Sequence, residues 1–256
     1  MLNAVRRHPL VAFFLLAFPL SWYPWIIALA RGTTTGPNPL GPLVAGLIVS
    51  GIVYGRRGLA EYLRRLVRGK VGLRWYVAVF GVPVAICATA AALAVVTGSP
   101  MTRLTANWKE VVETFVFIFL FIGLGEEPGW RGFAVEHLQE TRSPFAASLI
   151  LAPIWTLWHL PLMGTEFPPA IVPPFAVTVF GSTFFLTWIY NNTRGSVLLP
   201  ALMHATVNTI GSGIVFRAFS GPASVRLWWI YAFLWLAIGL SVMAPIGSRG
   251  LVAKES

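Results

Sequence analysis

Eight long apolar runs, divided by short polar connections, constrain this chain more than any other feature of its sequence. A helix needs about 20 mostly apolar residues to cross the hydrocarbon core of a bilayer. Several runs are shorter than that, so their ends must extend into the polar flanks. The pattern predicts an all-α, polytopic membrane bundle of about eight transmembrane helices, with seven as the alternative count. The apolar runs lie at 9–30, 40–54, 75–96, 111–124, 145–162, 170–190, 197–216 and 227–245.

Composition agrees with lipid as the main solvent of this chain. Hydrophobic residues make up 56% of the sequence and charged residues 11%, and the mean hydropathy is +0.72. No stretch is polar enough to form a separate soluble domain, so residues 1–256 are expected to form a single membrane domain. The first apolar run is longer than the core of a signal peptide, about 7 to 15 residues, and is therefore interpreted as a retained helix.

The positive charges predict an orientation. The net charge is +10, and five of the 19 Lys and Arg side chains fall outside if the N-terminus lies in the cytoplasm: Arg31, Arg103, Lys109, Arg217 and Arg226. Cytoplasmic connections carry the excess of Lys and Arg in membrane proteins, so both termini are expected to be cytoplasmic. Cations between apolar runs suit anionic lipid headgroups, so membrane lipids are expected partners and nucleic acid is not. Short connections without targeting extensions are typical of a prokaryotic inner-membrane protein.

Gly51 and Gly55 form a GxxxG pattern in the second apolar run. Such a pattern allows two helix backbones to approach closely. Here it is interpreted as packing within the bundle.

Ionisable side chains follow directly after the fourth apolar run. Burying one at the centre of a transmembrane helix costs roughly 2.5 kcal/mol or more, so such residues are candidates for function. Glu126 and Glu127 are adjacent, and Arg131 follows Glu127 by four residues, which places these two on one helix face. Glu126 lies about 100° around the helix from Glu127 and is expected to point elsewhere. Pro128 is expected to loosen the helix at this point.

Two further runs carry polar groups at one-turn spacing. Trp155 is followed by His159, and His204 is followed by Asn208. If tight cytoplasmic turns lie near 139–143 and 192–195, the axial rise of a helix places the polar groups of all three runs at matching depth. The expected layer, nearer the cytoplasmic side, contains Glu126, His159, His204 and Asn208. A Glu–Arg pair is also common structural glue in membrane bundles, and for Glu127 and Arg131 that interpretation stays open.

These residues together resemble one family. Its members are the type II CAAX prenyl endopeptidases and bacteriocin-processing proteases, called the CPBP or Abi family of intramembrane proteases. The family motifs are EExxxR, an aromatic residue four positions before a His, and HxxxN. They read here, in order, as Glu126, Glu127 and Arg131; Trp155 and His159; His204 and Asn208. The family often has Phe where this chain has Trp155. The family-like core spans about 107–216.

The resemblance implies an intramembrane endopeptidase that hydrolyses a peptide bond of a membrane-associated substrate. Glu126 would be the general base that activates water, with help from His159. His204 and Asn208 would donate hydrogen bonds to the developing oxyanion. Glu127 and Arg131 would hold Glu126 in place. Peptides carrying a lipid and signal-like peptides both stay open as substrates.

The resemblance leaves the metal question open. Two His and one Glu can bind Zn²⁺ with a position left for water, and the set would be Glu126, His159 and His204. Members of the family have also been described as metal-independent glutamate proteases, so no cofactor is firmly expected and Zn²⁺ is the alternative.

Other classes of intramembrane protease do not fit this sequence. A presenilin-type enzyme needs two Asp, and the chain has none. An HExxH helix is absent, as is the GxSG of rhomboids. Two alternatives remain: a scaffold or immunity protein of the same family that does not cleave peptides, and a proton-coupled transporter. The transporter is disfavoured because no inverted repeat is visible.

Overall fold

The computed structural model describes residues 2–102, 104 and 106–247, and every regular element in that part of the chain is helical. Arg103, used above to predict the orientation, lies outside the described residues, as do two cations counted on the cytoplasmic side, Arg249 and Lys254. The α-helices are α1 (Leu2–Arg7), α2 (Pro9–Ala30), α3 (Gly41–Leu66), α4 (Leu73–Val96), α5 (Trp108–Phe117), α6 (Leu124–Gly129), α7 (Glu136–Leu138), α8 (Pro144–Trp158), α9 (Val172–Asn192), α10 (Leu198–Ile210) and α11 (Gly221–Gly247).

Shorter helical turns of other types complete these elements. Three are π-helical: η1 (Ile118–Gly123), η2 (Trp130–Val135) and η5 (Gly211–Val215). Three are 3₁₀ turns: η3 (Leu160–Leu162), η4 (Pro169–Ile171) and η6 (Phe216–Ala218). The elements from α5 to α7 follow one another without a break, so residues 108–138 form one long helical segment.

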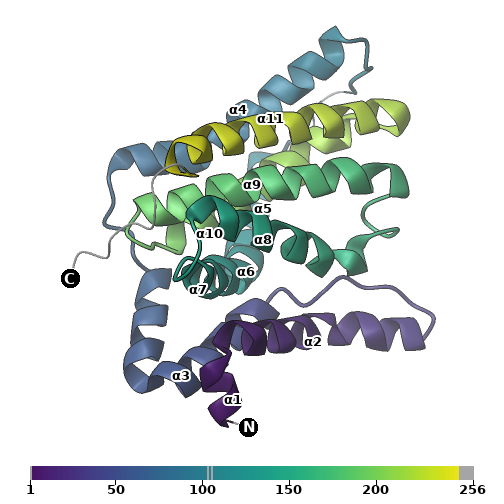
Figure 1. Cartoon of the computed structure of the whole chain (residues 1–256). Helices are drawn as coiled ribbons and strands as arrows, with labels where there is room; N and C mark the ends of the chain where they lie inside the picture. Colours follow the sequence, from purple (N-terminus) through teal and green to yellow (C-terminus); the bar gives the residue numbers. More distant parts are fainter. Residues whose placement is uncertain (1, 103, 105, 248–256) are drawn as a thin grey trace.

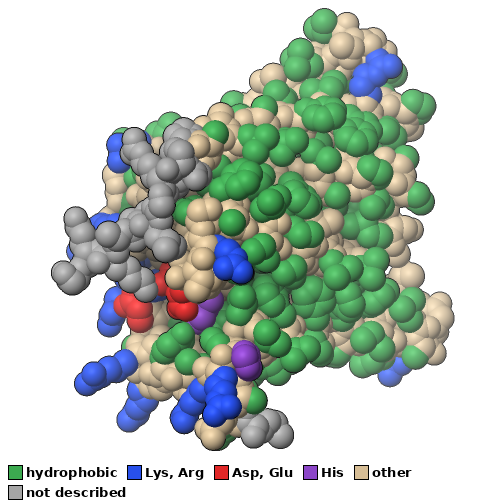
Figure 2. All heavy atoms as spheres, viewed as in Figure 1, with side chains coloured by type: hydrophobic (Ala, Val, Ile, Leu, Met, Phe, Trp, Pro, Cys, Tyr) green, Lys and Arg blue, Asp and Glu red, His purple; other side chains and the backbone are tan. Residues whose placement is uncertain are grey.

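The protein is a multi-pass membrane protein with an all-α polytopic bundle. Within the described residues, six helical segments are long and apolar enough to cross a membrane: Pro9–Ala30, Gly41–Leu66, Leu73–Val96, Pro169–Asn192, Leu198–Ala218 and Gly221–Ala244. The remaining two apolar runs of the sequence correspond to the segment 108–138, which carries the buried charges, and to α8, which has 15 residues. Figure 2 shows apolar side chains over most of the visible face, with charged side chains gathered mainly at one end.

Local sequence signals explain where several helices begin. Asn107 accepts a hydrogen bond from the backbone N–H of Lys109 at the start of α5. Ser143 does the same for Ala146 at the start of α8, where Pro144 is the first helical residue. Such caps satisfy backbone donors that have no partner within the helix.

The helix α3 is bent at Gly55. This residue has φ +62° and ψ −155°, outside the helical region, so the first part of α3 enters the bundle and the second part turns across its end (Figure 1). A side chain at Gly51 or Gly55 would meet no atom within 4 Å. The interpretation of this GxxxG pattern as a packing motif is therefore wrong, because Gly55 supplies the backbone freedom for a bend.

The bent part of α3 is anchored to the charged end of the bundle. Arg65 forms an ion pair with Glu136 at 3.0 Å and donates a hydrogen bond to the Tyr190 hydroxyl at 2.8 Å. That hydroxyl donates in turn to Glu136 at 2.8 Å. The cluster links α3, α7 and α9 at the cation-rich end.

The connection between α2 and α3 runs back into the bundle instead of staying outside it (Figure 1). Residues 33–38 have no regular structure. The backbone N–H of Asn38 donates to the carbonyl of Ser21 at 2.7 Å, in the middle of α2. Irregular backbone at membrane depth is tolerated where it is buried in protein or lines a water-filled cavity. Pro37 and Pro39 also reduce the number of N–H donors that need a partner here.

Candidate active site

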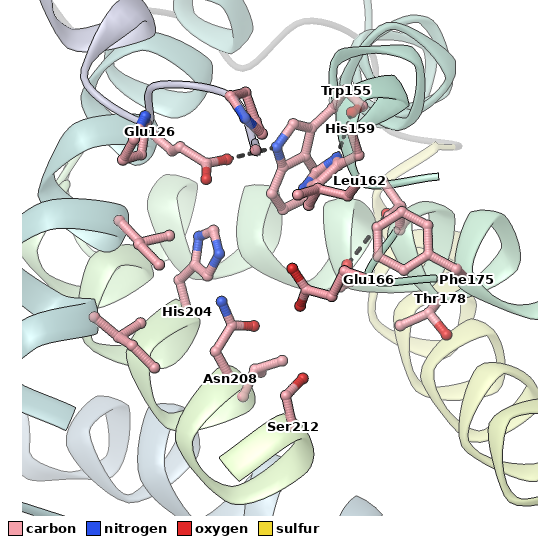
Figure 3. Close-up of a pocket in the computed structure, with 18 of the residues that line it drawn as sticks. Glu126, Trp155, His159, Leu162, Glu166, Phe175, Thr178, His204, Asn208 and Ser212 are labelled. Atoms are coloured by element: carbon pink, nitrogen blue, oxygen red, sulfur yellow. Dashed lines mark hydrogen bonds between the residues drawn. The ribbon is translucent and has the colours of Figure 1, made fainter. Parts of the chain in front are cut away.

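One cavity of about 480 Å³ brings together polar groups from three separate helical segments (Figure 3). Its lining includes Glu126 of α6, His159 at the end of α8, and both His204 and Asn208 of α10. The rest of the wall is mostly apolar. The four side chains that the sequence places in one layer thus lie on one cavity, whereas Glu127 and Arg131 lie behind its wall.

Glu126 is fixed in place by two tryptophans. Its Oε2 accepts a hydrogen bond from the indole N–H of Trp155 at 2.9 Å and another from Trp130 at 3.2 Å. The residue is 3% exposed. Its Oε1 accepts no hydrogen bond from any residue that the structure describes, so this oxygen is free to interact with a molecule in the cavity.

Glu127 points the other way, into the protein. Its Oε1 lies 2.8 Å from Nδ1 of His204, and its carboxylate forms an ion pair with Arg131 at 3.0 Å. Glu127 and Arg131 are fully buried. The guanidinium of Arg131 lies over the ring of Trp155 at 4.2 Å, a cation–π contact.

The two histidines are oriented by different acceptors. Nδ1 of His159 lies 2.7 Å from the carbonyl oxygen of Trp155. A carbonyl can only accept, so Nδ1 carries the proton and Nε2 of the neutral ring is an acceptor. Nδ1 of His204 faces the Glu127 carboxylate, which also leaves Nε2 as the ring nitrogen available to the cavity.

The helix that carries both acids is irregular on either side of them. The π-helical segments η1 and η2 flank α6, and Pro128 lies inside it. Proline has no N–H and disturbs the preceding turn, and π-helical turns are frequent at functional sites. The expectation that Pro128 loosens the helix agrees with this geometry.

Two glycines allow the chain before α3 and its first turn to approach the acids closely. A Cβ on Gly125 would lie 2.6 Å from the carbonyl oxygen of Pro39, and one on Gly129 would collide with Pro42. The connection after α2 is thereby held against α6, and Gly36, Pro37 and Pro39 join the lining of the cavity.

The structure corrects the expected support of Glu126. Sequence reasoning assigns that role to Glu127 and Arg131, but these two residues hold His204 and the Trp155 ring. Trp130 and Trp155 hold Glu126 directly. Trp130 follows Glu126 by four residues, the same spacing that relates Glu127 to Arg131, so this signal was present in the sequence.

The cavity opens toward the end of the bundle opposite the cation-rich end. Its lining includes Gly36 from the connection after α2, Glu166 from the connection after α8, and Arg217 from η6. Among the described residues, its lining takes none from the connections at the cation-rich end. The sequence argument placed the polar layer nearer the cation-rich, cytoplasmic side, and the access to it lies at the other end.

The side chains do not form a metal centre in this arrangement. Within the part of the chain that the structure describes, no group of three or more His, Cys, Asp or Glu side chains is placed to hold a metal ion. The trio Glu126, His159 and His204 therefore does not fit the zinc site considered from the sequence.

Comparison with known proteins identifies the segment that carries these residues. Residues 106–210 match the model of the family described as type II CAAX prenyl endopeptidase Rce1-like. The chain is also similar to a protein named CAAX prenyl protease 2 from Methanococcus maripaludis, with 29% identity over 102 residues. That match covers 36% of this chain and 38% of the relative. All three motifs fall inside the matched segment, so residues 106–210 of this chain are similar to the Rce1-like endopeptidases.

Proposed function

We propose that this protein is a membrane endopeptidase that hydrolyses a peptide bond of a membrane-associated substrate with water activated by Glu126. One observation carries the proposal. Glu126 presents one free carboxylate oxygen to a cavity that two imidazoles and a carboxamide also line, while two indole N–H groups hold its other oxygen. A general base needs this combination of a fixed position and an available lone pair.

The first half of the reaction uses Glu126 and His159. A water molecule in the cavity, beside Oε1 of Glu126, gives a proton to this carboxylate. At the same time the oxygen of the water attacks the carbonyl carbon of the substrate. His159 accepts a hydrogen bond from the same water at Nε2 and so orients it. The carbonyl oxygen becomes an oxyanion as the tetrahedral intermediate forms.

The second half uses His204 and Asn208, the two polar residues that α10 presents to the cavity. Asn208, through its amide N–H, and His204, from Nε2 when that nitrogen is protonated, donate hydrogen bonds to the oxyanion. The C–N bond then breaks, and the proton held by Glu126 moves to the leaving amine. The products are a carboxylic acid and an amine, so one water is consumed. Glu127 and Arg131 act as positioning residues, because they touch His204 and Trp155 rather than the cavity.

The cavity wall suits an apolar part of the substrate. Phe117 and Phe121 line the cavity and are 57% and 48% exposed. An apolar side chain or a lipid attached to the substrate can lie against these rings. The name of the Methanococcus relative is compatible with a prenylated peptide, and signal-like peptides fit the same wall.

The orientation of the bundle sets the side from which substrate arrives. With both termini cytoplasmic, the cation-rich end faces the cytoplasm and the open end of the cavity faces the opposite side. The proposed substrate is therefore a peptide segment at the non-cytoplasmic face of a prokaryotic inner membrane.

The direct test compares three proteins in detergent against a library of fluorogenic peptides. The wild type is expected to cleave a subset, and Glu126→Gln is expected to lose about 100-fold or more of kcat, the contribution of a positioned general base. Glu113→Gln is the matched control, because Glu113 lies in the same helical segment with its side chain 64% exposed and paired with Lys109. Retained cleavage by folded Glu126→Gln would overturn the mechanism.

The same assay addresses the metal. Activity after exhaustive chelation, together with purified protein that contains no zinc, supports water activation by Glu126 alone. Activity that is lost on chelation and restored by Zn²⁺ would instead show that substrate or metal rearranges the three side chains into a ligand set.

A scaffold or immunity role without proteolysis remains the alternative function. It predicts that a phenotype of the deletion strain is rescued by Glu126→Gln as well as by the wild type. Rescue by the wild type alone supports the hydrolase.

A further inference from the structure

Glu166 lies in the lining of the same cavity, outside the three motifs, and has no assigned role. It sits in the connection between η3 and η4. In Figure 3 its carboxylate points into the cavity, toward the side on which His204 and Asn208 lie.

The backbone around Glu166 is held in a tight turn. The carbonyl of Leu162 accepts hydrogen bonds from the N–H groups of both Glu166 and Phe167 at 3.0 Å, and Gly164 donates to the carbonyl of Phe167 at 2.8 Å. Gly164 has φ +81°, which favours glycine at this position. The turn therefore presents the Glu166 side chain from a defined position.

The next residue anchors the turn to the bundle. Phe167 is 8% exposed, and its ring lies 4.4 Å from that of Phe175 and 5.8 Å from that of Trp228. This packing ties the turn to α9 and α11. A side chain adjacent to such an anchor can contribute to selectivity, because little conformational freedom is lost when a ligand binds.

The carboxylate itself has no cationic partner. Among the described residues no Lys, Arg or His lies within ion-pair distance of Glu166, although Arg217 lines the same cavity. The Glu166 side chain is exposed, and its partial desolvation beside the cavity wall raises the pKa of its carboxyl above the usual value. An unpaired acid that has lost part of its hydration gains most from a cation that arrives with the ligand.

We propose that Glu166 forms a subsite for a cationic group of the peptide substrate, either a Lys or Arg side chain or a free α-amino group. The proposal rests on the proposed peptidase function and adds a charge preference to it. Because the rest of the wall is mostly apolar, one carboxylate is enough to discriminate between a cation, a neutral group and an anion at this place. A peptide with an acidic residue there is disfavoured by like-charge repulsion.

The experiment uses matched peptides that the wild type cleaves. Each sequence is made with Lys, with norleucine and with Glu at one position at a time, and with a free or an acetylated N-terminus. The wild type is expected to show a kcat/KM at least about 10-fold higher for the cationic member at one position. A preference for Lys identifies a side chain as the ligand, and a preference for the free N-terminus identifies the α-amino group.

Variants of Glu166 provide the decisive comparison. Glu166→Gln is expected to bring the ratio of kcat/KM for the cationic peptide to kcat/KM for the neutral peptide close to one. Glu166→Lys is expected to give the highest kcat/KM with the acidic peptide. Glu113→Gln should leave the ratio as in the wild type. A ratio that is the same in Glu166→Gln, Glu166→Lys and the wild type overturns the subsite.

Peptide binding keeps this test separate from the peptidase function. Fluorescence anisotropy with Glu126→Gln, alone and combined with Glu166→Gln, measures the affinity for the same labelled peptides without cleavage. If no peptide is cleaved by the wild type but the cationic peptide still binds about 10-fold more weakly when Glu166 is replaced, the peptidase proposal fails and the subsite stands. If cleavage depends on Glu126 while neither affinity nor selectivity depends on Glu166, only the subsite fails.

Discussion

The carboxylate of Glu127 lies 2.8 Å from Nδ1 of His204, a contact that joins α6 to α10 across 77 positions of the chain. Its neighbour Glu126 turns to the cavity and is held by indole donors instead. Consecutive residues of a helix differ in direction by about 100°. Two adjacent acids can therefore serve two purposes, one facing the proposed substrate and the other orienting an imidazole from behind.

The buried pair of Glu127 and Arg131 leads to a prediction about stability. Glu127→Gln leaves the Arg131 charge without its partner, so it is expected to destabilise the protein by about 3–5 kcal/mol. Replacing both residues, as in Glu127→Gln with Arg131→Met, removes the stranded charge and is expected to restore much of that loss. Thermal unfolding of the purified proteins in detergent measures both effects.

The same variants separate stability from activity. The double variant is expected to stay poorly active even where it unfolds near the wild-type temperature, because His204 has lost the carboxylate at Nδ1. A double variant that regains both stability and full activity would show that Glu127 and Arg131 serve the fold alone.

Trp155 is expected to contribute one hydrogen bond to the position of Glu126. Trp155→Phe keeps an aromatic ring beside Arg131 and His204 but removes the indole N–H. A hydrogen bond to a charged group contributes about 1.5–3 kcal/mol, so kcat is expected to fall by roughly 10-fold to 100-fold. Because Trp130 still donates to Glu126 and the family often has Phe at this position, activity should remain measurable. An unchanged kcat would contradict this role of the Trp155 N–H.

Gly129 is expected to tolerate no side chain. Gly129→Ala places a methyl group against Pro42, and overpacking of this kind costs typically 1–3 kcal/mol. Gly51→Ala is the matched control, because a Cβ there meets nothing within 4 Å and alanine is the better helix former. Unfolding temperatures should fall for the first variant and stay equal or rise for the second. Equal behaviour of the two variants would show that the close approach of α3 and α6 is not required.

Cysteine labelling tests the proposed orientation. The chain has one cysteine, Cys87, which is fully buried, so Cys87→Ala provides a background without a reactive thiol. In this background Thr165→Cys is expected to react with a membrane-impermeant maleimide in intact cells, and Arg57→Cys only after the cells are permeabilised. Both positions are exposed at opposite ends of the bundle. The reverse pattern would place the open end of the cavity in the cytoplasm.

Local features of the sequence predicted much of this protein. The apolar runs predicted a polytopic helical bundle, because the thickness of the bilayer fixes how many apolar residues a helix must contain. The i, i+4 spacing predicted that Glu127 and Arg131 share a face, and the ion pair confirms it. The match over residues 106–210 agrees with the family resemblance that the three motifs indicated.

Non-local contacts could not be predicted in the same way. The bend at Gly55 depends on a positive φ that a GxxxG pattern does not reveal. The indole of Trp155 reaches Glu126 across 29 positions, and helix periodicity gives the depth of a residue but not the rotation of its helix against a neighbour.

The sequence by itself determined the class of fold, the family resemblance and the residues that bring charge into the membrane, because hydrophobicity and spacing act along one helix at a time. Only the tertiary structure decided which acid faces the cavity, which side chains hold it, and that Glu166 lies on the same cavity. These relationships depend on how helices from distant parts of the chain are rotated and packed against one another. That packing is a property of the whole bundle, since each close approach needs a matching surface on both partners.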